Sequence, residues 1–301
     1  EEQYKKNKKN KNEVPIVEFR KECRSFAEKW IEVHKSQFKR LGVVGDWENY
    51  YSTMSFDAEA QIVRELGKFL KEGSLYRGFK PVLWSTVEKT ALADAEVEYQ
   101  DHKSDTIYAS FKVKSSNLKN LVGVEIIIWT TTPWTLPSNL AVAVGSELDY
   151  VRAQKEGDKT IYIVAKERVK AVLGKKFTVL STLKGSELVG CSYQPLFDYF
   201  TDERPNAFVV IASDHVTTGD GTGLVHMAPD FGEDDFLACK AAGIQVVQSV
   251  DDEGNFEDSV RDFVGQNIKA ADPAIIRMLK EHGRIFKQST IQHSYPYCWR
   301  S

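Results

Sequence analysis

Residues 124–139 read Val-Glu-Ile-Ile-Ile-Trp-Thr-Thr-Thr-Pro-Trp-Thr-Leu-Pro-Ser-Asn. The apolar run from Val124 to Ile128 is typical of a buried β-strand, and Pro133 cannot extend a hydrogen-bonded ladder. The three hydroxyls of Thr130–Thr132 are therefore expected at the end of a strand, on the rim of a sheet. This layout indicates a binding site, although threonine is also common in strands that only turn a corner.

Apolar residues alternate with polar ones along much of the chain after about residue 80, which predicts many short strands. Glu156-Gly157-Asp158 has the composition of a hairpin turn between two of them. The expected strands cover residues 107–113, 124–131, 140–144, 150–153, 161–165, 177–180, 207–212, 223–227 and 245–250.

Helical periodicity is confined to a few segments. Apolar residues spaced by three and four predict amphipathic helices over 19–41, ended by Gly42, and over 57–73. Further helices are expected over 234–242 and from Asp272-Pro273 to Gly283. We therefore expect an α+β fold with a mainly antiparallel, barrel-like domain and interspersed helices, preceded by a helical segment.

Composition places few limits on function. A chain of 301 residues with 42% hydrophobic content can bury a proper core, and a net charge of −3 excludes binding to nucleic acid by bulk charge alone. The four cysteines have no Cys-x-x-Cys spacing, and no apolar run reaches 18 residues. We expect a cytoplasmic protein without a membrane segment.

A second polar segment, residues 221–235, reads Gly-Thr-Gly-Leu-Val-His-Met-Ala-Pro-Asp-Phe-Gly-Glu-Asp-Asp. Its glycines permit tight turns or close backbone approach, so that His226 and Asp235 would project from a constrained loop. Taken alone, His226 could equally be a hydrogen-bonded histidine within a strand. Asp235 alone could be a carboxylate that the dipole of a helix favours at its amino terminus.

Together and in this order, the two segments resemble the editing domain of isoleucyl-tRNA synthetases, and the resemblance covers essentially all 301 residues. It implies a hydrolytic site that removes valine attached by mistake to the isoleucine tRNA. Asp235 resembles the carboxylate that binds the α-amino group of the mischarged residue. His226 resembles the wall that excludes the larger isoleucine side chain.

The resemblance also implies roles for the first segment. Valyl and leucyl enzymes typically carry arginine after paired threonines, whereas this chain has Thr132, which favours the isoleucyl type. Asn139 matches a neighbouring family position that is also implicated in editing. Thr130 and Trp134 resemble residues that shape the pocket. The positions resembling threonines that place the ester and its attacking water are Thr131, Thr132 and Thr135.

Two departures from the family bear on cofactors. Many members bind zinc with two Cys-x-x-Cys pairs, and tetrahedral zinc requires four such ligands. The matching positions here are Ser85, Glu88, Cys298 and Ser301, so we expect no zinc. The chain also contains neither the His-x-Gly-His nor the Lys-Met-Ser-Lys-Ser signature of ATP binding. We expect ATP and Mg to be cofactors of the parent enzyme and not of this fragment.

We accordingly expect residues 1–80 to belong to a Rossmann-type catalytic domain and residues 81–301 to form the editing domain, with 81–100 and 285–301 as its stalk. The expected function is hydrolysis of valyl-tRNA, and of valyl-adenylate, by a monomer that binds the tRNA acceptor end. Neither a metal nor a covalent intermediate is required. The alternatives are a non-catalytic module that only holds the acceptor end, and a threonine-nucleophile hydrolase unrelated to tRNA.

Overall fold

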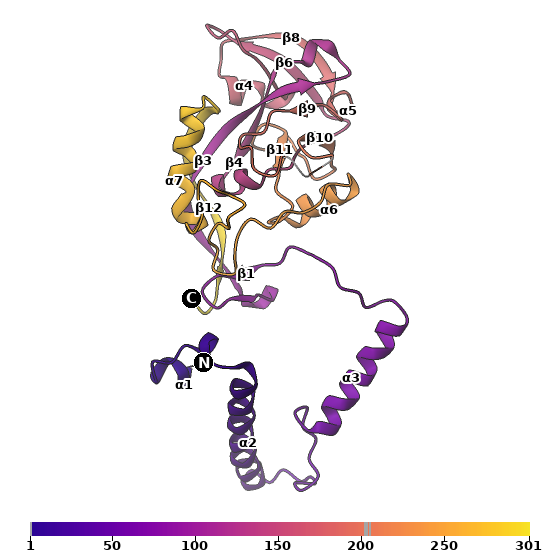
Figure 1. The fold of residues 1–301 in the computed structure, drawn as a ribbon, viewed down its shortest axis with the longest axis vertical. Coiled ribbons are helices and arrows are strands. Elements are labelled where there is room, and N and C mark those ends of the chain that lie inside the picture. The colour runs from indigo at the N-terminus through magenta and orange to yellow at the C-terminus, as the bar shows by residue number, and fades with distance from the viewer. Residues whose placement is uncertain (1, 202–203, 205) are drawn as a thin grey trace. The chain divides into compact units, whose positions relative to one another are not determined.

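The computed structural model describes residues 2–201, 204 and 206–301 (Figure 1). The chain divides into two compact units, of which the first ends at Gly78 and the second spans Phe79–Ser301. The boundary follows from the sequence pattern, because the first unit contains only helices whereas the second contains every strand of the described residues.

The first unit contains the two expected amphipathic helices, which are confirmed as α2 (Ile16–Arg40) and α3 (Phe56–Lys71). Gly42 and Gly73 follow their last turns with φ of +81° and +77°, a conformation that glycine adopts without strain. The Ser55 hydroxyl accepts a hydrogen bond from the Ala58 N–H and so caps α3. Shorter helical segments are α1 (Glu2–Lys6) and η1 (Lys11–Glu13).

The apolar stripes of α2 and α3 are open to solvent. No residue of either helix is buried, and the large apolar side chains on them are 44–56% exposed at Phe26, Trp30, Ile62, Leu66 and Phe69. Exposed stripes of this extent are normally covered by other structure. That these helices belong to a catalytic domain stays a prediction.

The second unit is built on a ten-stranded, mainly antiparallel sheet, which confirms the expected α+β class. Its hydrogen-bonded order is β11-β5-β10-β9-β3-β4-β7-β6-β8, with β12 paired to β3, and the pairs β10·β5 and β4·β7 are parallel. This order has two free ends, so the sheet of the described residues is not a closed barrel. The strands are β3 (Val97–Ser115), β4 (Glu125–Thr130), β5 (Ala141–Val144), β6 (Asp149–Lys155), β7 (Ile161–Ala165), β8 (Phe177–Lys184), β9 (Ser192–Tyr193), β10 (Val209–Ala212), β11 (Leu224–Met227) and β12 (Ile285–Cys298).

Strand β4 lies at the centre of the sheet and leads into the candidate site. Ile126, Ile127 and Ile128 are all 0% exposed, as expected for an apolar run with both faces covered. Pro133 then ends the strand geometry and begins the 3-10 helix η4 (Pro133–Ser138). The predicted hairpin is also confirmed, because β6 and β7 are antiparallel and Gly157 in their turn has φ of +81°.

In the part of the second unit that the structure describes, four α-helices accompany the sheet: α4 (Val169–Leu173), α5 (Gly185–Leu188), α6 (Glu233–Ala241) and α7 (Ile268–Glu281). The expected start of α7 at Asp272-Pro273 is wrong. The Asn267 side chain accepts from the Lys269 N–H at 3.1 Å and begins the helix earlier, and Pro273 lies inside it. The early turns are stabilised by burial of Ala271 and Ile275.

The expected strand over 245–250 is also wrong. Val247 and Ser249 are buried, so the alternation in the sequence is real, but the segment has only an isolated bridge between Val250 and Phe256. The Ser249 N–H, which a ladder would use, instead faces the Asp230 carboxylate at 3.4 Å. The segment is therefore extended chain that side-chain contacts hold in place.

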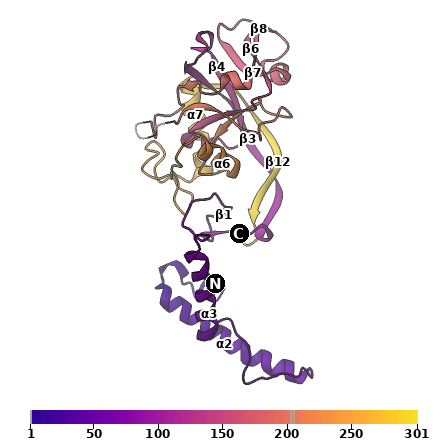
Figure 2. The ribbon, with the colours of Figure 1, turned by 90° about the vertical axis from the view of Figure 1, so that its right-hand side faces the viewer.

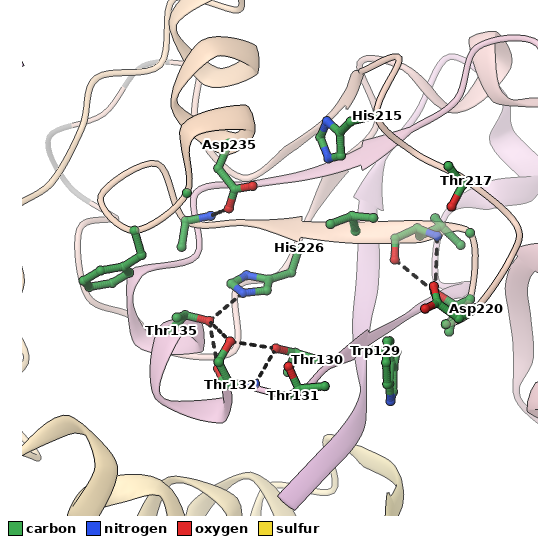
Figure 3. A pocket seen from close by; sticks show the side chains of 18 residues that line it. Trp129, Thr130, Thr131, Thr132, Thr135, His215, Thr217, Asp220, His226 and Asp235 are labelled. Carbon is green, nitrogen blue, oxygen red and sulfur yellow. Dashed lines mark hydrogen bonds between the residues drawn. The ribbon is translucent and has the colours of Figure 1, made fainter. Parts of the chain in front are cut away.

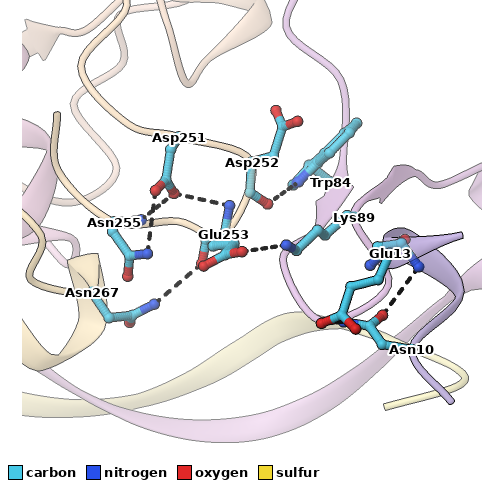
Figure 4. Close-up of polar contacts among 10 residues, drawn as sticks. Asn10, Glu13, Trp84, Lys89, Asp251, Asp252, Glu253, Asn255 and Asn267 are labelled. Atoms are coloured by element: carbon cyan, nitrogen blue, oxygen red, sulfur yellow. Dashed lines mark hydrogen bonds and ion pairs between the residues drawn. The ribbon is translucent and has the colours of Figure 1, made fainter. Parts of the chain in front are cut away.

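Strands β3 and β12 form a long antiparallel ribbon, visible side by side in Figure 2. Its pairing runs from Val97 opposite Cys298 to Ala109 opposite Ile285. At its base lies a small sheet of β1 (Trp84–Ser85) and β2 (Thr90–Ala91), with the short 3-10 helix η2 (Asp94–Glu96) following. Around this base the Trp84 indole N–H donates to the Asp252 carbonyl at 2.9 Å and Lys89 pairs with Glu253 (Figure 4).

Candidate functional site

A pocket of about 430 Å³ lies within the second unit. One wall comes from the end of β4 and from η4, another from β11 and the loop before it, and a third from the start of α6 (Figure 3). Both polar segments singled out in the sequence therefore meet in one pocket. The predicted residues that line it are Thr130, Thr131, Thr132, Thr135, His226 and Asp235.

The threonines form a connected row of hydroxyls. Thr130 Oγ1 accepts from the Thr132 N–H at 3.1 Å and lies 3.3 Å from Thr132 Oγ1. Thr135 Oγ1 donates to the Thr132 carbonyl at 2.8 Å, which folds η4 back toward the strand end. Within the described part of the chain the Thr131 hydroxyl makes no hydrogen bond, so it is available to a bound molecule.

His226 is buried on β11, opposite Val142 of β5, and both of its ring nitrogens are engaged. The Asn139 amide N–H₂ can only donate, so Nδ1, 3.3 Å away, is the acceptor. Nε2 therefore carries the proton and donates to Thr135 Oγ1 at 2.8 Å. Burial lowers the pKa of His226 to about 4, which keeps the ring neutral near pH 7. His226 therefore lines the pocket as a neutral ring that its two hydrogen bonds hold in one orientation.

Asp235 lies in the first turn of α6 with its carboxylate facing the pocket. Its Oδ2 accepts from the Ala228 N–H at 2.7 Å. Burial raises the pKa of Asp235, while the Ala228 bond and the nearby His215 lower it. A carboxylate in such surroundings gains most from a cationic partner, because an opposite charge offsets the cost of desolvation.

Two glycines allow the close packing that aims these groups. A Cβ on Gly232 would lie 2.9 Å from Asp235 Cγ, so a side chain there would displace the carboxylate. Gly223, with φ of +76°, leaves room for Ala165, whose Cβ would be 2.3 Å from an added Cβ. The approach is fixed by the Ala165 N–H, which donates to the Thr222 carbonyl at 2.9 Å.

Two of the expected substrate-binding residues do not line the pocket. Trp134 packs edge-on against Phe231, with ring centroids 4.7 Å apart, and it is Phe231 that reaches the pocket. Asn139 is buried behind His226, where its Oδ1 accepts from the Tyr193 hydroxyl at 2.7 Å. Both residues therefore support the lining from behind.

Some lining residues were missed in the sequence. His215, Thr217 and Asp220 come from the loop between β10 and β11. In Figure 3, His215 lies toward Asp235 and Asp220 lies beside Trp129. The only available signal was their position just before the Gly-Thr-Gly turn. The Ser213 hydroxyl oxygen lies 2.7 Å from His215 Nδ1, and this hydrogen bond holds the imidazole ring in one orientation.

The four positions compared with zinc ligands come together at the base of the ribbon. The Glu88 N–H donates to Ser85 Oγ at 3.1 Å. The pKa of Cys298 is lowered mainly by the Arg300 backbone N–H and to a smaller extent by the Ser301 and Ser85 hydroxyls. One thiol, one carboxylate and two hydroxyls do not fit tetrahedral zinc, which takes thiolate, imidazole and carboxylate ligands. No cluster of three such metal-binding side chains occurs among the described residues.

None of the helices in the described part of the chain is long and apolar enough to cross a membrane. A family model described as tRNA synthetases class I (I, L, M and V) matches residues 1–287. Isoleucine–tRNA ligase of Pelagibacter ubique (strain HTCC1062) is 56% identical over 312 residues, which cover 100% of this chain and 34% of the relative. The same ligase of Zymomonas mobilis is 45% identical over 315 residues, covering 100% and 33%.

The chain thus spans about a third of the length of these curated relatives. Among solved structures, the cytosolic leucyl-tRNA synthetase editing domain of P. falciparum has a TM-score of 0.45 and 9% sequence identity. The similarity covers 62% of this chain and 99% of that one.

Proposed function

Because this chain belongs to the class I tRNA synthetases of the isoleucine, leucine, methionine and valine group, we propose that its pocket is an editing site. The proposed reaction is hydrolysis of the ester that links valine to the isoleucine tRNA. One observation carries the proposal. The half-buried Asp235 carboxylate and a row of threonine hydroxyls lie on opposite sides of the neutral His226 in a single pocket (Figure 3).

Recognition of the amino acid follows from charge and size. Asp235 binds the α-ammonium group, whose positive charge offsets the partial desolvation of this half-buried carboxylate. His226, held by Thr135 and Asn139, limits the space for the side chain. One methylene contributes roughly 1–3 kcal/mol to selection in the synthetic site, a magnitude established for isoleucyl-tRNA synthetases themselves, so a second, smaller pocket is needed to remove valine.

Hydrolysis requires a positioned water and stabilisation of the oxyanion that forms when it attacks. The Thr131 and Thr132 hydroxyls at the pocket wall position the ester and the water. His226 is not the general base, because its Nδ1 already accepts from Asn139 and its Nε2 carries a proton. Proton transfer is then assisted by the neighbouring ribose hydroxyl of the terminal adenosine, and no threonine becomes acylated.

The wider assignment rests on the same resemblance. The parent enzyme would ligate isoleucine to its tRNA with ATP and Mg, and the first unit would be part of its catalytic domain. The pocket would also accept valyl-adenylate, and the protein would act in the cytoplasm as a monomer. We further propose that the ribbon base holds no zinc, and metal analysis of the purified protein tests this directly. One zinc per chain would refute it.

Release of valine from preformed mischarged tRNA tests the proposal. Valyl-tRNA and isoleucyl-tRNA are each incubated with the protein at high concentration, and free amino acid is measured over time. We expect hydrolysis of valyl-tRNA and sparing of isoleucyl-tRNA. Tight binding of both without release would instead indicate a module that only holds the acceptor end. A trappable acyl-enzyme would indicate a threonine nucleophile.

A further inference from the structure

The short helix η4 (Pro133–Ser138) carries one wall of the pocket, and both of its ends are held from behind. The first N–H groups of a helix have no partner within it. In η4 the first residue is a proline without an N–H, so the Trp134 N–H is the first donor that needs a partner. The groups that contact the two ends of η4 therefore determine the positions of Thr132 and Thr135.

A carboxylate from α7, that of Asp272, lies at the first end. That helix packs against η4, and Asp272 lies near enough to the Trp134 backbone N–H for it to favour the charged form of the carboxyl. The rest of the surroundings of Asp272 favours its neutral, protonated form. Asp272 Oδ1 is buried and has no hydrogen-bond partner among the described residues, and Asp105 adds a like charge nearby.

The second end is held through a buried serine pair. Ser138, the last residue of η4, donates from its hydroxyl to Ser249 Oγ at 2.7 Å, and both serines are 0% exposed. The Ser249 N–H and hydroxyl in turn lie 3.4 Å from Asp230 Oδ2. Asp230 follows β11 and precedes Asp235, so this chain of contacts joins the two walls of the pocket beneath its lining.

Neither carboxylate reaches the pocket, and no step of the proposed hydrolysis uses them. Burial nonetheless makes both expensive, since it raises the pKa of Asp230 to about 6 and that of Asp272 to about 7. Each end of this six-residue helix thus has a half-buried carboxylate whose desolvation costs stability, and we infer that each is kept because it holds the helix in place.

We propose that Asp272 and the Ser249–Asp230 pair, together the η4 clamp, are positioning residues that fix Thr132 and Thr135 for ester hydrolysis. The inference rests on the proposed editing function and deepens it. The clamp acts through the backbone of η4 and never contacts substrate.

The kinetic test compares alanine, which removes the acceptor, with asparagine, which keeps one. Asp272→Ala and Asp230→Ala should each slow valine release at saturating substrate about tenfold with KM changed less than twofold, because misplacement of reacting groups affects the chemical step. Asp272→Asn should recover most of the rate. Asp258→Ala is the matched control, since Asp258 is exposed and outside the pocket. Wild-type rates in both alanine variants, or equal losses in Asp272→Asn and Asp272→Ala, would overturn the inference.

Amide hydrogen exchange provides a readout that does not depend on hydrolysis. In the intact protein, residues 132–139 should exchange about tenfold faster in the alanine variants than in wild type, as expected for a segment released from its contacts. Ser249→Ala breaks the second contact without removing a carboxylate and should have the same effect. Unchanged exchange would refute the clamp even if no deacylation were found, whereas faster exchange without any deacylation would refute only the proposed function.

Discussion

Replacing Asp272 with asparagine should stabilise the protein at neutral and alkaline pH. The substitution keeps the shape of the side chain and removes a charge that burial disfavours. The pKa of Asp272 rises from 3.8 to about 7, chiefly through burial and further through Asp105. Tyr295 of β12 also faces this carboxyl, and its phenol stays neutral over the range because burial raises its pKa as well.

The size and sign of the effect follow from linkage. Between about pH 4 and pH 7 the folded state holds a proton that the unfolded state has lost, so wild-type stability falls as pH rises through this window. Three pKa units correspond to an upper bound of about 4 kcal/mol. Because part of the side chain reaches solvent, screening reduces this, and we expect roughly 2 kcal/mol.

Urea unfolding of wild type and Asp272→Asn at several pH values between 4.5 and 8 measures the difference. The advantage of the variant in unfolding free energy should grow as pH rises and level off above about pH 7. Asp258→Asn, an exposed site, should show no such trend. A difference that stayed constant with pH, or that favoured wild type increasingly at high pH, would refute the reasoning.

Three further predictions concern the pocket. Asp235→Ala should lower kcat/KM for valyl-tRNA about a hundredfold without unfolding the protein, since an ammonium left without its carboxylate costs about 3 kcal/mol; near-normal deacylation would remove Asp235 from the site. Thr131→Ala with Thr132→Ala should reduce kcat more than it raises KM, as measured by single-turnover hydrolysis, and a change in KM alone would make them binding groups. His226→Ala should release isoleucine from its tRNA while keeping much of the activity on valyl-tRNA, because overpacking that costs roughly 1–3 kcal/mol is relieved. With the pKa of His226 near 4, wild-type rates between pH 5.5 and 8.5 should show no histidine ionisation, and parallel loss on both substrates would contradict the steric role.

Local patterns in the sequence predicted much of the fold, because those signals act over a few residues. The glycine at 157 fixed a hairpin turn, and the threonine row at 130–132 ended a strand before Pro133 as expected. The threonines and His226 were also expected in one site, and the structure brings them into one pocket. The role of each in hydrolysis stays a prediction.

Features that depend on distant contacts were not predictable in this way. The alternation at 245–250 is typical of a strand, but the Ser249 N–H faces Asp230 instead of a neighbouring strand. The helix expected from Asp272 begins earlier, at the Asn267 cap, because packing of its first turns outweighs the unfavourable Pro273. The contacts at the two ends of η4 join residues that are far apart in the sequence. Ser249 follows its partner Ser138 by 111 residues, and Asp272 comes from α7, so no local pattern predicts these contacts.

The β3–β12 ribbon has a consequence for synthesis on the ribosome. Among the residues that the structure describes, 97–106 of β3 pair only with β12, whose first residue is Ile285. At ordinary translation rates of about 5–20 residues per second, that part of β3 waits roughly 10–35 s for its partner. An unpaired strand edge is a template for wrong pairing, and charged side chains discourage it. Glu98, Asp101, Lys103 and Asp105 occupy this stretch, so the strand segment that waits for a distant partner also carries charges that discourage pairing with a neighbouring nascent chain.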